Sequence, residues 1–341
     1  MTTTSTAAEH ALAAFRGLAI GDALGMPTQS LSLEQIRSDH GVISGFVDAG
    51  PNQRIAHGMP AGSITDDTEQ AVLVAELLVQ GHGRLDPVDF ARALIDWERT
   101  MAAKGSLDLL GPSTKTAVQR ILDGVPASEA GSTGTTNGAA MRITPVGIAT
   151  PLGTGSDGLA GLVDAVQDAC RVTHDTGLGI AGASAVAAAV SAGIDGATRA
   201  EALDVAVVAA RIGETRGHWV AGGSIADRTE WARGHLATVP DAERIDVVSG
   251  LIGTSVASQE SVVAALALVA LDLDPWRTVC TAASIGGDTD TIAAMAGAVL
   301  GAVHGAAAWS ADAVHQVETV NDLHLEELTE RLLDLRTGPG R

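Results

Sequence analysis

An all-α fold, organised as one helical bundle, is predicted by three features of the sequence. Hydrophobic residues make up 46% of the 341-residue chain, and they recur at helical rather than alternating spacing. Aromatic residues are only 2%, with no tyrosine, whereas alanine is abundant and glycines number 40. Such a core requires closely packed helices with short side chains between them. No linker divides the chain, so we expect a single domain over residues 7–336, with flexible ends at 1–6 and 337–341.

The first half of the chain alternates helices with loops rich in Gly and Pro. Pro27 ends the first helix because it cannot continue one, and Ser32 with Gln35 forms a capping-box pattern for the second. Residues 41–63 have no clean period, and a loop this long in a compact domain is usually functional, so we interpret it as a rim or lid. Helices are predicted over 7–24, 33–38, 65–80 and 87–103, and again from 113 or 114.

The second half contains the longest apolar helical segments. Residues 131–147 carry too many Gly and Thr for regular structure before about Ala139. Residues 213–250 form the most polar interior region, which we interpret as an insertion or a substrate rim. Further helices are predicted over 157–172, 176–193, 198–212, 256–271, 275–284, 291–308 and 323–335.

Charge and cysteine content exclude several classes of function. The net charge of −20, from 21 basic and 41 acidic residues, makes bare nucleic acid a poor partner because phosphate binding needs basic patches. Cys170 and Cys280 lie in apolar helical patterns and indicate buried free thiols, as expected in a reducing cytoplasm. The N-terminus lacks the pattern of a signal peptide, and the apolar runs are short or interrupted by Gly. We expect a soluble cytoplasmic protein that binds no membrane; a monomer is the simplest expectation.

Two acidic clusters, each at the start of a predicted helix, are the most informative feature. The first contains Thr65, Asp66, Asp67 and Thr68, and the second contains Asp288, Asp290 and Thr291. Asp and Thr at a helix start are ordinarily N-caps, and capping alone explains either cluster by itself. Capping needs one carboxylate, however, and four carboxylates brought together repel one another without a cation. Mg²⁺ and Mn²⁺ take oxygen ligands, so the pair of clusters favours a metal site, with one or two ions.

Other polar residues are weaker signals. Asp22, in an apolar glycine-flanked helix, is either a hydrogen-bonded structural group or a support for metal ligands. His174, at a break between helices, is either structural or a ligand contact. Glycine-containing loops at 111–114 and 134–138 offer backbone amides to an anionic or ribosyl ligand. P-loop, GxSxG, CxxC and HExxH motifs do not occur, so any chemistry is predicted to be metal-assisted attack by water.

Five blocks of the sequence, in order, resemble the ADP-ribosylglycohydrolase family: GLAIGDALGMP, ITDDTEQAVLVA, NGAAMRITPVG, VTHDT and SIGGDTDTIAAMAGAVLGA. The resemblance covers about residues 12–306 and implies an orthogonal all-α bundle with two Mg²⁺ or Mn²⁺ ions in a central cleft. The metal ligands that it implies are Thr65, Asp66, Asp67, Asp288, Asp290 and Thr291. It further implies hydrolysis at ribose C1″ by a water that an aspartate orients or deprotonates, the candidates being Asp66, Asp67 and Asp290.

The resemblance also implies a binding site for ADP-ribose or an ADP-ribosylated protein. Its residues are Gln29, Gly111, Ser113, Thr114, Gly134, Thr135, Thr136, Asn137, Gly138, His174 and Val256. Gln29 departs from the family, because many members carry a glutamate there, on a mobile flap. A glutamine cannot act as a general base, so the departure favours N-linked substrates of the ADP-ribosyl-arginine type over serine-linked ones.

Three hypotheses for the function therefore remain open on the sequence. The first is an ADP-ribosyl hydrolase that acts on an N-linked adduct. The second is a metal-dependent hydrolase of a nucleoside or another small ribosyl compound. The third is a non-catalytic ADP-ribose-binding relative, which only Gln29 supports.

Overall fold

The structure is a computed structural model that describes residues 2–103, 110–153 and 155–338. Over these residues the chain is helical, which confirms the predicted fold class. Extended segments meet there only as isolated bridges between single residue pairs, which are Leu31 with Gly287, Thr136 with Ala257 and Thr176 with His218. Residues 1 and 339–341, which belong to the predicted flexible ends, lie outside the described residues.

Helices fill most of the segments for which the sequence predicts them. In the first half they are α1 Thr2–Gly25, α2 Leu33–Asp39, α3 Asp66–Gln80, α4 Pro87–Ala103, α5 Pro112–Leu122, α6 Gly138–Met141, α7 Thr144–Ala149, α8 Gly155–Cys170 and α9 Gly177–Ile194. In the second half they are α10 Arg199–Gly213, α11 Ile225–Leu236, α12 Arg244–Val247, α13 Ser258–Val269, α14 Pro275–Ala282, α15 Thr289–His304, α16 Ala311–Asn321 and α17 Leu325–Thr337. Short 3-10 or π turns complete them at η1 Met26–Thr28, η2 Ala127–Glu129, η3 Asp241–Glu243, η4 Val248–Ile252 and η5 Gly305–Ala308.

Local capping explains why several helices begin where predicted. The amide of Gln35 donates to Oγ of Ser32 at 3.2 Å, and the amide of Ser32 donates to Oε1 of Gln35 at 2.9 Å, so the predicted capping box of α2 is confirmed. Oδ1 of Asp86 accepts from the amide of Val88 at 2.8 Å and begins α4. Each cap satisfies a backbone donor that has no partner inside its own helix.

Several elements differ from the prediction, and among them α11 and α12 lie within residues 213–250, where no helix was predicted. Helix α1 begins at Thr2 rather than at Ala7, because no Gly or Pro interrupts the preceding Thr and Ser residues. Helix α16 was not predicted: Ser310 caps it by accepting from the amide of Ala313 at 3.2 Å, but its polar composition hides the helical period. The helix expected from about Ala139 is two short helices, α6 and α7, since Pro145 lies at the start of the second.

The packing of α1 against α15 is the most extensive helix contact in the described chain, and glycines make it possible. A Cβ atom on Gly17 would overlap the carbonyl oxygen of Gly297, and a Cβ on Gly297 would overlap that of Gly17. A Cβ on Gly25 would likewise overlap the backbone of Asp290. The two backbones therefore touch, and the C-terminal end of α1 lies against the first turn of α15.

Two helices are apolar and long enough to cross a membrane by length and composition, Gly177–Ile194 and Thr289–Ala308. In the folded chain 94% of the first and 78% of the second is buried. They are therefore core helices, surrounded by the rest of the bundle.

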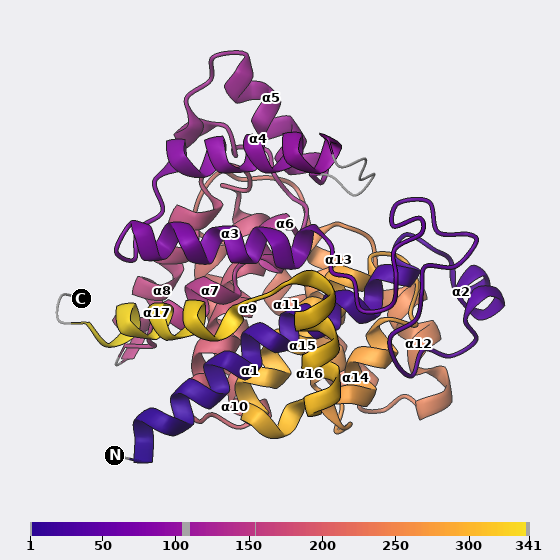
Figure 1. Ribbon diagram of the computed structural model, residues 1–341. Helices are drawn as coiled ribbons and strands as arrows, with labels where there is room; N and C mark the ends of the chain where they lie inside the picture. Colours follow the sequence, from indigo (N-terminus) through magenta and orange to yellow (C-terminus); the bar gives the residue numbers. More distant parts are fainter. Residues whose placement is uncertain (1, 104–109, 154, 339–341) are drawn as a thin grey trace.

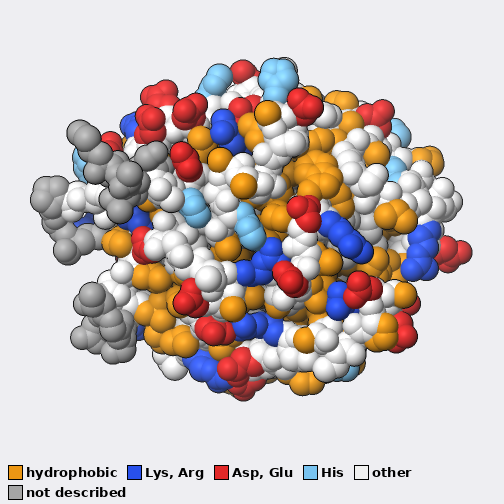
Figure 2. All heavy atoms as spheres, turned by 90° about the horizontal axis from the view of Figure 1, so that it is seen from below, with side chains coloured by type: hydrophobic (Ala, Val, Ile, Leu, Met, Phe, Trp, Pro, Cys, Tyr) orange, Lys and Arg blue, Asp and Glu red, His pale blue; other side chains and the backbone are white. Residues whose placement is uncertain are grey.

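The remaining elements lie around this core (Figure 1). Helices α4 and α5 lie above α3 at one end of the molecule, and α2 with the irregular residues 41–63 lies at one side. Figure 2 shows acidic and basic side chains interspersed around a band of hydrophobic ones on the lower face. Both cysteines are free and buried, and burial raises the pKa of each thiol to about 12.

Candidate metal centre and ligand site

The two acidic clusters lie against each other at the N-terminal ends of α3 and α15. Oγ1 of Thr291 donates to Oδ2 of Asp67 at 3.2 Å, across 224 positions of sequence. Thr65 is the N-cap of α3, and Asp288 is the residue that precedes α15. The carboxylates thus lie where the amide groups of two helix starts contribute a positive potential.

Asp22 holds the first cluster in place from α1. Its fully buried carboxylate accepts from the amide and Oγ1 of Thr65, at 3.0 and 2.8 Å, and from the amide of Thr68 at 3.1 Å. Oγ1 of Thr68 donates to it as well. Burial raises the pKa of Asp22 to about 6, although these hydrogen bonds act in the opposite direction. Asp22 is thus a hydrogen-bonded structural group that orients Thr65, and its support of a metal ligand stays a prediction.

The electrostatics of the cluster fit a bound cation. Burial raises the pKa of Asp67 well above its usual value, and neighbouring carboxylates raise it further, in the order Asp290, Asp22, Asp66 and Asp288. Oδ1 of Asp67 is buried without a hydrogen-bond partner. A divalent cation would neutralise this repulsion and provide a partner for that oxygen.

Carboxylates alone do not complete such a site. Within the described residues, no three His, Cys, Asp or Glu side chains are placed to hold an ion by themselves. Mg²⁺ is commonly bound through one or two carboxylates and keeps several waters. The cluster therefore suits that ion if threonine hydroxyls and water supply the remaining oxygens.

The second cluster connects directly to the glycine-rich loop at 134–138. Nδ2 of Asn137 donates to Oδ2 of Asp288 at 2.5 Å and to Oγ of Ser261 at 2.9 Å. Burial raises the pKa of Asp288, while the hydrogen bonds from Asn137 and Thr291 lower it. The amide of Asn137 donates to the carbonyl oxygen of Val256 at 2.9 Å. A single asparagine thus joins the acidic cluster to two of the segments expected to bind the ligand.

The loop at 111–114 lies against the same glycine-rich loop. Oγ of Ser113 accepts from the amides of Thr135 and Thr136, at 3.2 and 3.3 Å. A Cβ atom on Gly138 would stand 3.0 Å from Cε1 of His174 and 3.6 Å from Oγ1 of Thr114. The structure therefore brings together four segments from separate parts of the sequence.

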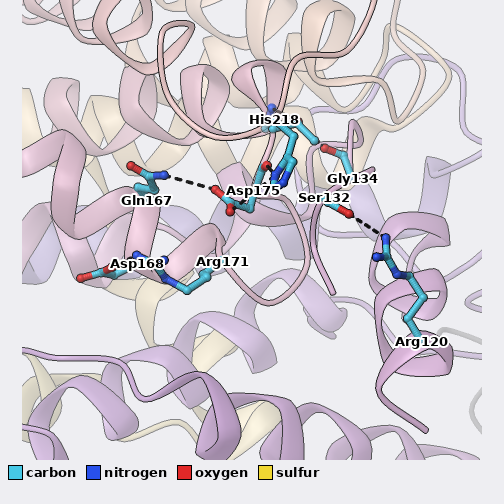
Figure 3. A network of polar contacts seen from close by, with 10 residues as sticks. Arg120, Ser132, Gly134, Gln167, Asp168, Arg171, Asp175 and His218 are labelled. Atoms are coloured by element: carbon cyan, nitrogen blue, oxygen red, sulfur yellow. Dashed lines mark hydrogen bonds and ion pairs between the residues drawn. The ribbon is translucent and has the colours of Figure 1, made fainter. Parts of the chain in front are cut away.

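Residues 173–176 fix the other side of this loop (Figure 3). Oγ1 of Thr176 donates to the carbonyl oxygen of Gly134 at 2.6 Å. Asp175 accepts from Nε2 of Gln167 at 3.3 Å and lies 3.7 Å from Nδ1 of His218. Thr176, the N-cap of α9, thus holds the loop, while the neighbouring Asp175 is held by α8 and by the segment that precedes α11.

His174 is fully buried beside the loop. Its Nε2 atom lies 2.9 Å from Oγ1 of Thr136, and its Nδ1 atom lies 2.7 Å from Oγ1 of Thr173. Burial, together with the nearby charge of Arg142, lowers the pKa of His174 well below its usual value. The imidazole is therefore neutral, and it acts as a hydrogen-bonding group rather than as a cation.

The family model for ADP-ribosylglycohydrolases matches residues 3–341. The chain belongs to the ADP-ribosylglycohydrolase family. A solved ADP-ribosylglycohydrolase-related protein complex shares the fold, with a TM-score of 0.67, 26% sequence identity, and coverage of 97% of this chain and 99% of the other.

Curated relatives in the same family include characterised and uncharacterised proteins. The uncharacterized protein YegU of Escherichia coli is 33% identical, over 96% of this chain and 97% of its own. The ADP-ribosylarginine hydrolase Tri1 of Pseudomonas putida is 25% identical, over 97% of this chain and 80% of its own. Family membership supports ADP-ribosyl glycohydrolase activity in general, with dependence on a divalent metal.

In this member of the family, Gln29 is held tightly at the C-terminal end of η1. It is 5% exposed, and its carbonyl oxygen accepts from Nε2 of Gln53 at 3.0 Å. The next amide, of Ser30, donates to the carbonyl oxygen of Gly287 at 2.6 Å. Nε2 of Gln29 itself is buried without a hydrogen-bond partner. The segment that carries Gln29 is therefore tied to the second acidic cluster and to residues 41–63.

Two predicted site residues are less closely integrated. A Cβ atom on Gly111 would meet no atom within 4 Å, so this residue lies open at the start of α5. Val256 is 40% exposed and joins the site through its backbone. An apolar cavity of about 390 Å³, between residues 42–44 and α14, contains none of the predicted site residues.

Two buried polar residues near the acidic cluster and the glycine-rich loop, Gln70 and Arg142, were not predicted from the sequence. Gln70 carried a signal, because it follows Asp66 by one helical turn and so shares its face of α3. Arg142 carried another, as a single cation within an apolar segment.

Proposed function

We propose that this protein is a metal-dependent ADP-ribosyl hydrolase that cleaves the glycosidic bond at ribose C1″ of an N-linked, arginine-type adduct. The observation that carries the proposal is the contact of the two acidic clusters at Asp67 and Thr291, with Asn137 joining them to the glycine-rich loop. An acidic centre beside a neutral, glycine-rich loop suits a ligand with a cation-bound sugar and a diphosphate.

The proposed ligands of two Mg²⁺ ions, with Mn²⁺ as the alternative, are the residues of both clusters: Thr65, Asp66, Asp67, Asp288, Asp290 and Thr291. When bound, the ions supply positive charge that orients the ribose hydroxyls and stabilises the negative charge of the cluster. Asp22 contributes by fixing Thr65, since it accepts both the amide and the hydroxyl of that residue.

The chain's own acidic groups would then act on water and on the sugar. Asp66, Asp67 or Asp290 is proposed to orient the attacking water and to accept its proton. The carboxylates also stabilise the positive charge that develops at C1″ in an oxocarbenium-like transition state. Gln29 contributes hydrogen bonding only, because an amide cannot accept a proton from water at neutral pH.

The ligand's diphosphate and adenosine are proposed to bind along residues 111–114 and 134–138, with His174 and Val256. The amides of Thr135 and Thr136 are already held by Ser113, so this loop needs little rearrangement on binding. A preorganised loop loses less conformational entropy when its ligand binds.

The test is release of free ADP-ribose from an arginine-ADP-ribosylated protein, with Mg²⁺, with Mn²⁺ and with EDTA. Asp288→Ala should lose metal binding and activity together, while its circular dichroism stays that of a helical protein. Asp312→Ala, at an acidic position in the first turn of α16, is the control. The proposal fails if Asp288→Ala keeps full activity, or if EDTA has no effect on the unmodified protein.

A second candidate, hydrolysis of a small ribosyl compound or nucleoside, is favoured by Gln29 and its buried, unpartnered amide. The same assay with nucleosides and with free ADP-ribosyl-arginine separates the two. Turnover of a nucleoside without release of ADP-ribose from protein would replace the first proposal. Tight binding of ADP-ribose without turnover of any substrate would indicate a non-catalytic relative.

A further inference from the structure

Arg142 is a fully buried cation between the acidic cluster and the glycine-rich loop. It follows α6 directly, and its guanidinium lies 5.1 Å from the centre of the Phe90 ring. One terminal nitrogen donates to Oε1 of Gln70 at 2.5 Å, and the other donates to Oγ1 of Thr173 at 2.6 Å. Burial lowers its pKa to about 10, so it remains charged at neutral pH.

The contact with Gln70 determines which way that amide faces. A guanidinium has donors only, so Gln70 must present its oxygen to Arg142. Its Nε2 group is therefore turned toward the acidic cluster, where it donates to Oδ2 of Asp66 at 2.7 Å. Arg142 thus fixes one oxygen of a proposed metal ligand without touching it.

The contact with Thr173 favours one direction for a second chain of hydrogen bonds, because a hydroxyl that accepts from a guanidinium has its own proton free to donate. Because Arg142 donates to the Thr173 hydroxyl, the proton of that hydroxyl is available to Nδ1 of His174, 2.7 Å away. A neutral imidazole that accepts at Nδ1 carries its proton on Nε2. Nε2 then donates to Oγ1 of Thr136 at 2.9 Å.

The consequence falls on Thr136. In the Nε2–H tautomer its hydroxyl accepts from the imidazole, so its own proton is not given to His174. Thr136 is half-buried in the loop whose amides Ser113 holds. It therefore offers a donor to an oxygen of a ligand bound along that loop, such as a phosphate oxygen.

We infer that Arg142 is a positioning residue that sets the direction of hydrogen bonding at both ends of the site. Toward α3 it orients Asp66 through Gln70, and toward the glycine-rich loop it makes Thr136 a donor, through Thr173 and His174. The identity of the ligand oxygen, part of an ADP-ribose-type diphosphate, rests on the proposed function. Lysine cannot replace Arg142, because a single ammonium does not span two acceptors in a fixed fork.

The first experiment measures the tautomer of His174 directly. In protein labelled with ¹⁵N-histidine and freed of metal by EDTA, His174 should show the shifts of an Nε2–H imidazole, assigned by the loss of its signals in His174→Gln. Thr173→Val removes the hydroxyl next to Nδ1 and should shift the population toward Nδ1–H. Thr173→Ser keeps the hydroxyl and should restore the native pattern.

The control is Thr229→Val in α11. Thr229 is buried like Thr173, but its hydroxyl has no hydrogen-bond partner, so its loss leaves His174 unchanged. Affinity for ADP-ribose, measured by calorimetry, should fall about tenfold in Thr173→Val, as expected for the loss of one well-made hydrogen bond. Thr136→Val should lose the same affinity and yet keep the Nε2–H tautomer.

The second experiment tests the branch toward α3. Gln70→Glu keeps an acceptor for Arg142 but loses the donor to Asp66. The affinity of this variant for Mn²⁺ should therefore fall about tenfold or more, because removal of a group that supports a metal ligand typically weakens metal binding by that amount. Gln119→Glu changes a similar pair on α5, in which Nε2 donates to Asp123 at 3.0 Å in an exposed position, and should leave Mn²⁺ affinity unchanged.

Three results would overturn the inference. They are an Nδ1–H tautomer in the unmodified protein, a Thr173→Val variant that matches Thr229→Val in tautomer and affinity, and a Gln70→Glu variant with native Mn²⁺ affinity. Failure of the proposed function has a different signature. The unmodified protein would then not bind ADP-ribose, which would remove the role given to Thr136, while the His174 tautomer would still report the direction set by Arg142.

Discussion

Replacing Asp67 by asparagine should stabilise the metal-free fold and weaken its stabilisation by divalent metal. Asp67 is 1% exposed, its Oδ1 atom has no hydrogen-bond partner, and burial with neighbouring carboxylates raises its pKa. Asparagine keeps an oxygen that accepts from Thr291 but removes the ionisable group. Folding then no longer has to bury that charge or to take up a proton in its place.

The size of the effect follows from the unpartnered oxygen. A buried acceptor without a partner costs about 1–3 kcal/mol, so in EDTA the variant should exceed the unmodified protein by about that amount in free energy of unfolding. For a chain of 341 residues this corresponds to a rise of roughly 1–4 °C in melting temperature. Metal at about 100 times its dissociation constant should stabilise the unmodified protein by about 2.7 kcal/mol, and the variant by much less.

Calorimetric melting of both proteins in EDTA and in saturating Mg²⁺ provides the measurement. Asp334→Asn is the matched control, because it makes the same chemical change at an exposed position of α17. The order of stability should invert between the two conditions for Asp67→Asn and stay constant for the control. A variant that is less stable than the unmodified protein in EDTA, or that gains as much from Mg²⁺, would refute the electrostatic account of the cluster.

Three further outcomes follow from the packing and from the pKa shifts. The folded-state pKa of Asp22 is raised from 3.8 to about 6, so its favourable contribution to the free energy of unfolding is complete below pH 3.8 and is lost as the pH rises through 6. Urea unfolding in EDTA should therefore show a loss of about 3 kcal/mol from this group by pH 7. Asp22→Asn should flatten that part of the pH profile. In Gly21→Ala the new Cβ would overlap the backbone of α15, so the free energy of unfolding should fall by about 1–3 kcal/mol or more. In Gly161→Ala, on α8, the new Cβ would have no atom within 4 Å. The free energy of unfolding of this variant should rise by about 0.5–1 kcal/mol. Arg336→Leu removes the donor to three carbonyl groups around the end of α7 and should cost about 1–3 kcal/mol in thermal unfolding. Arg331→Leu, on the exposed face of the same helix, should cost about 0.5 kcal/mol or less.

Features that depend on neighbours in sequence were predictable. The start of α2 follows from Ser32 and Gln35, which meet because they are three residues apart in a first helical turn. The start of α3 at Asp66 follows from a local contact as well, because the preceding Thr65 is its N-cap. Even the meeting of the two acidic clusters was accessible, since an excess of carboxylate over what capping needs indicates a shared cation.

Features that depend on which helices pack together were not predictable from local pattern. In the sequence, Gly17 and Gly297 are two isolated glycines in apolar segments. Nothing in either segment indicates that their backbones touch, so that a Cβ atom on one would overlap the carbonyl oxygen of the other. The contact of Arg142 with Gln70 and Thr173 was hidden for the same reason: its partners lie 72 and 31 positions away. A single sequence shows that a buried cation needs acceptors, but only the fold shows which ones it has.

The close packing of α1 on α15 and the acidic site are one feature of this fold. Glycines let the two backbones touch, and that contact places Asp22 of α1 and Asp290 of α15 close enough to Asp67 to raise its pKa. A larger residue at Gly25 would separate the helices at the position of Asp290. The small residues of the core therefore set the spacing of the carboxylates, and the repulsion among those carboxylates makes the metal-free fold less stable than its packing alone would allow. Loss of a core glycine and loss of metal should consequently not be additive, because a protein whose helices have already moved apart has less repulsion for a cation to relieve.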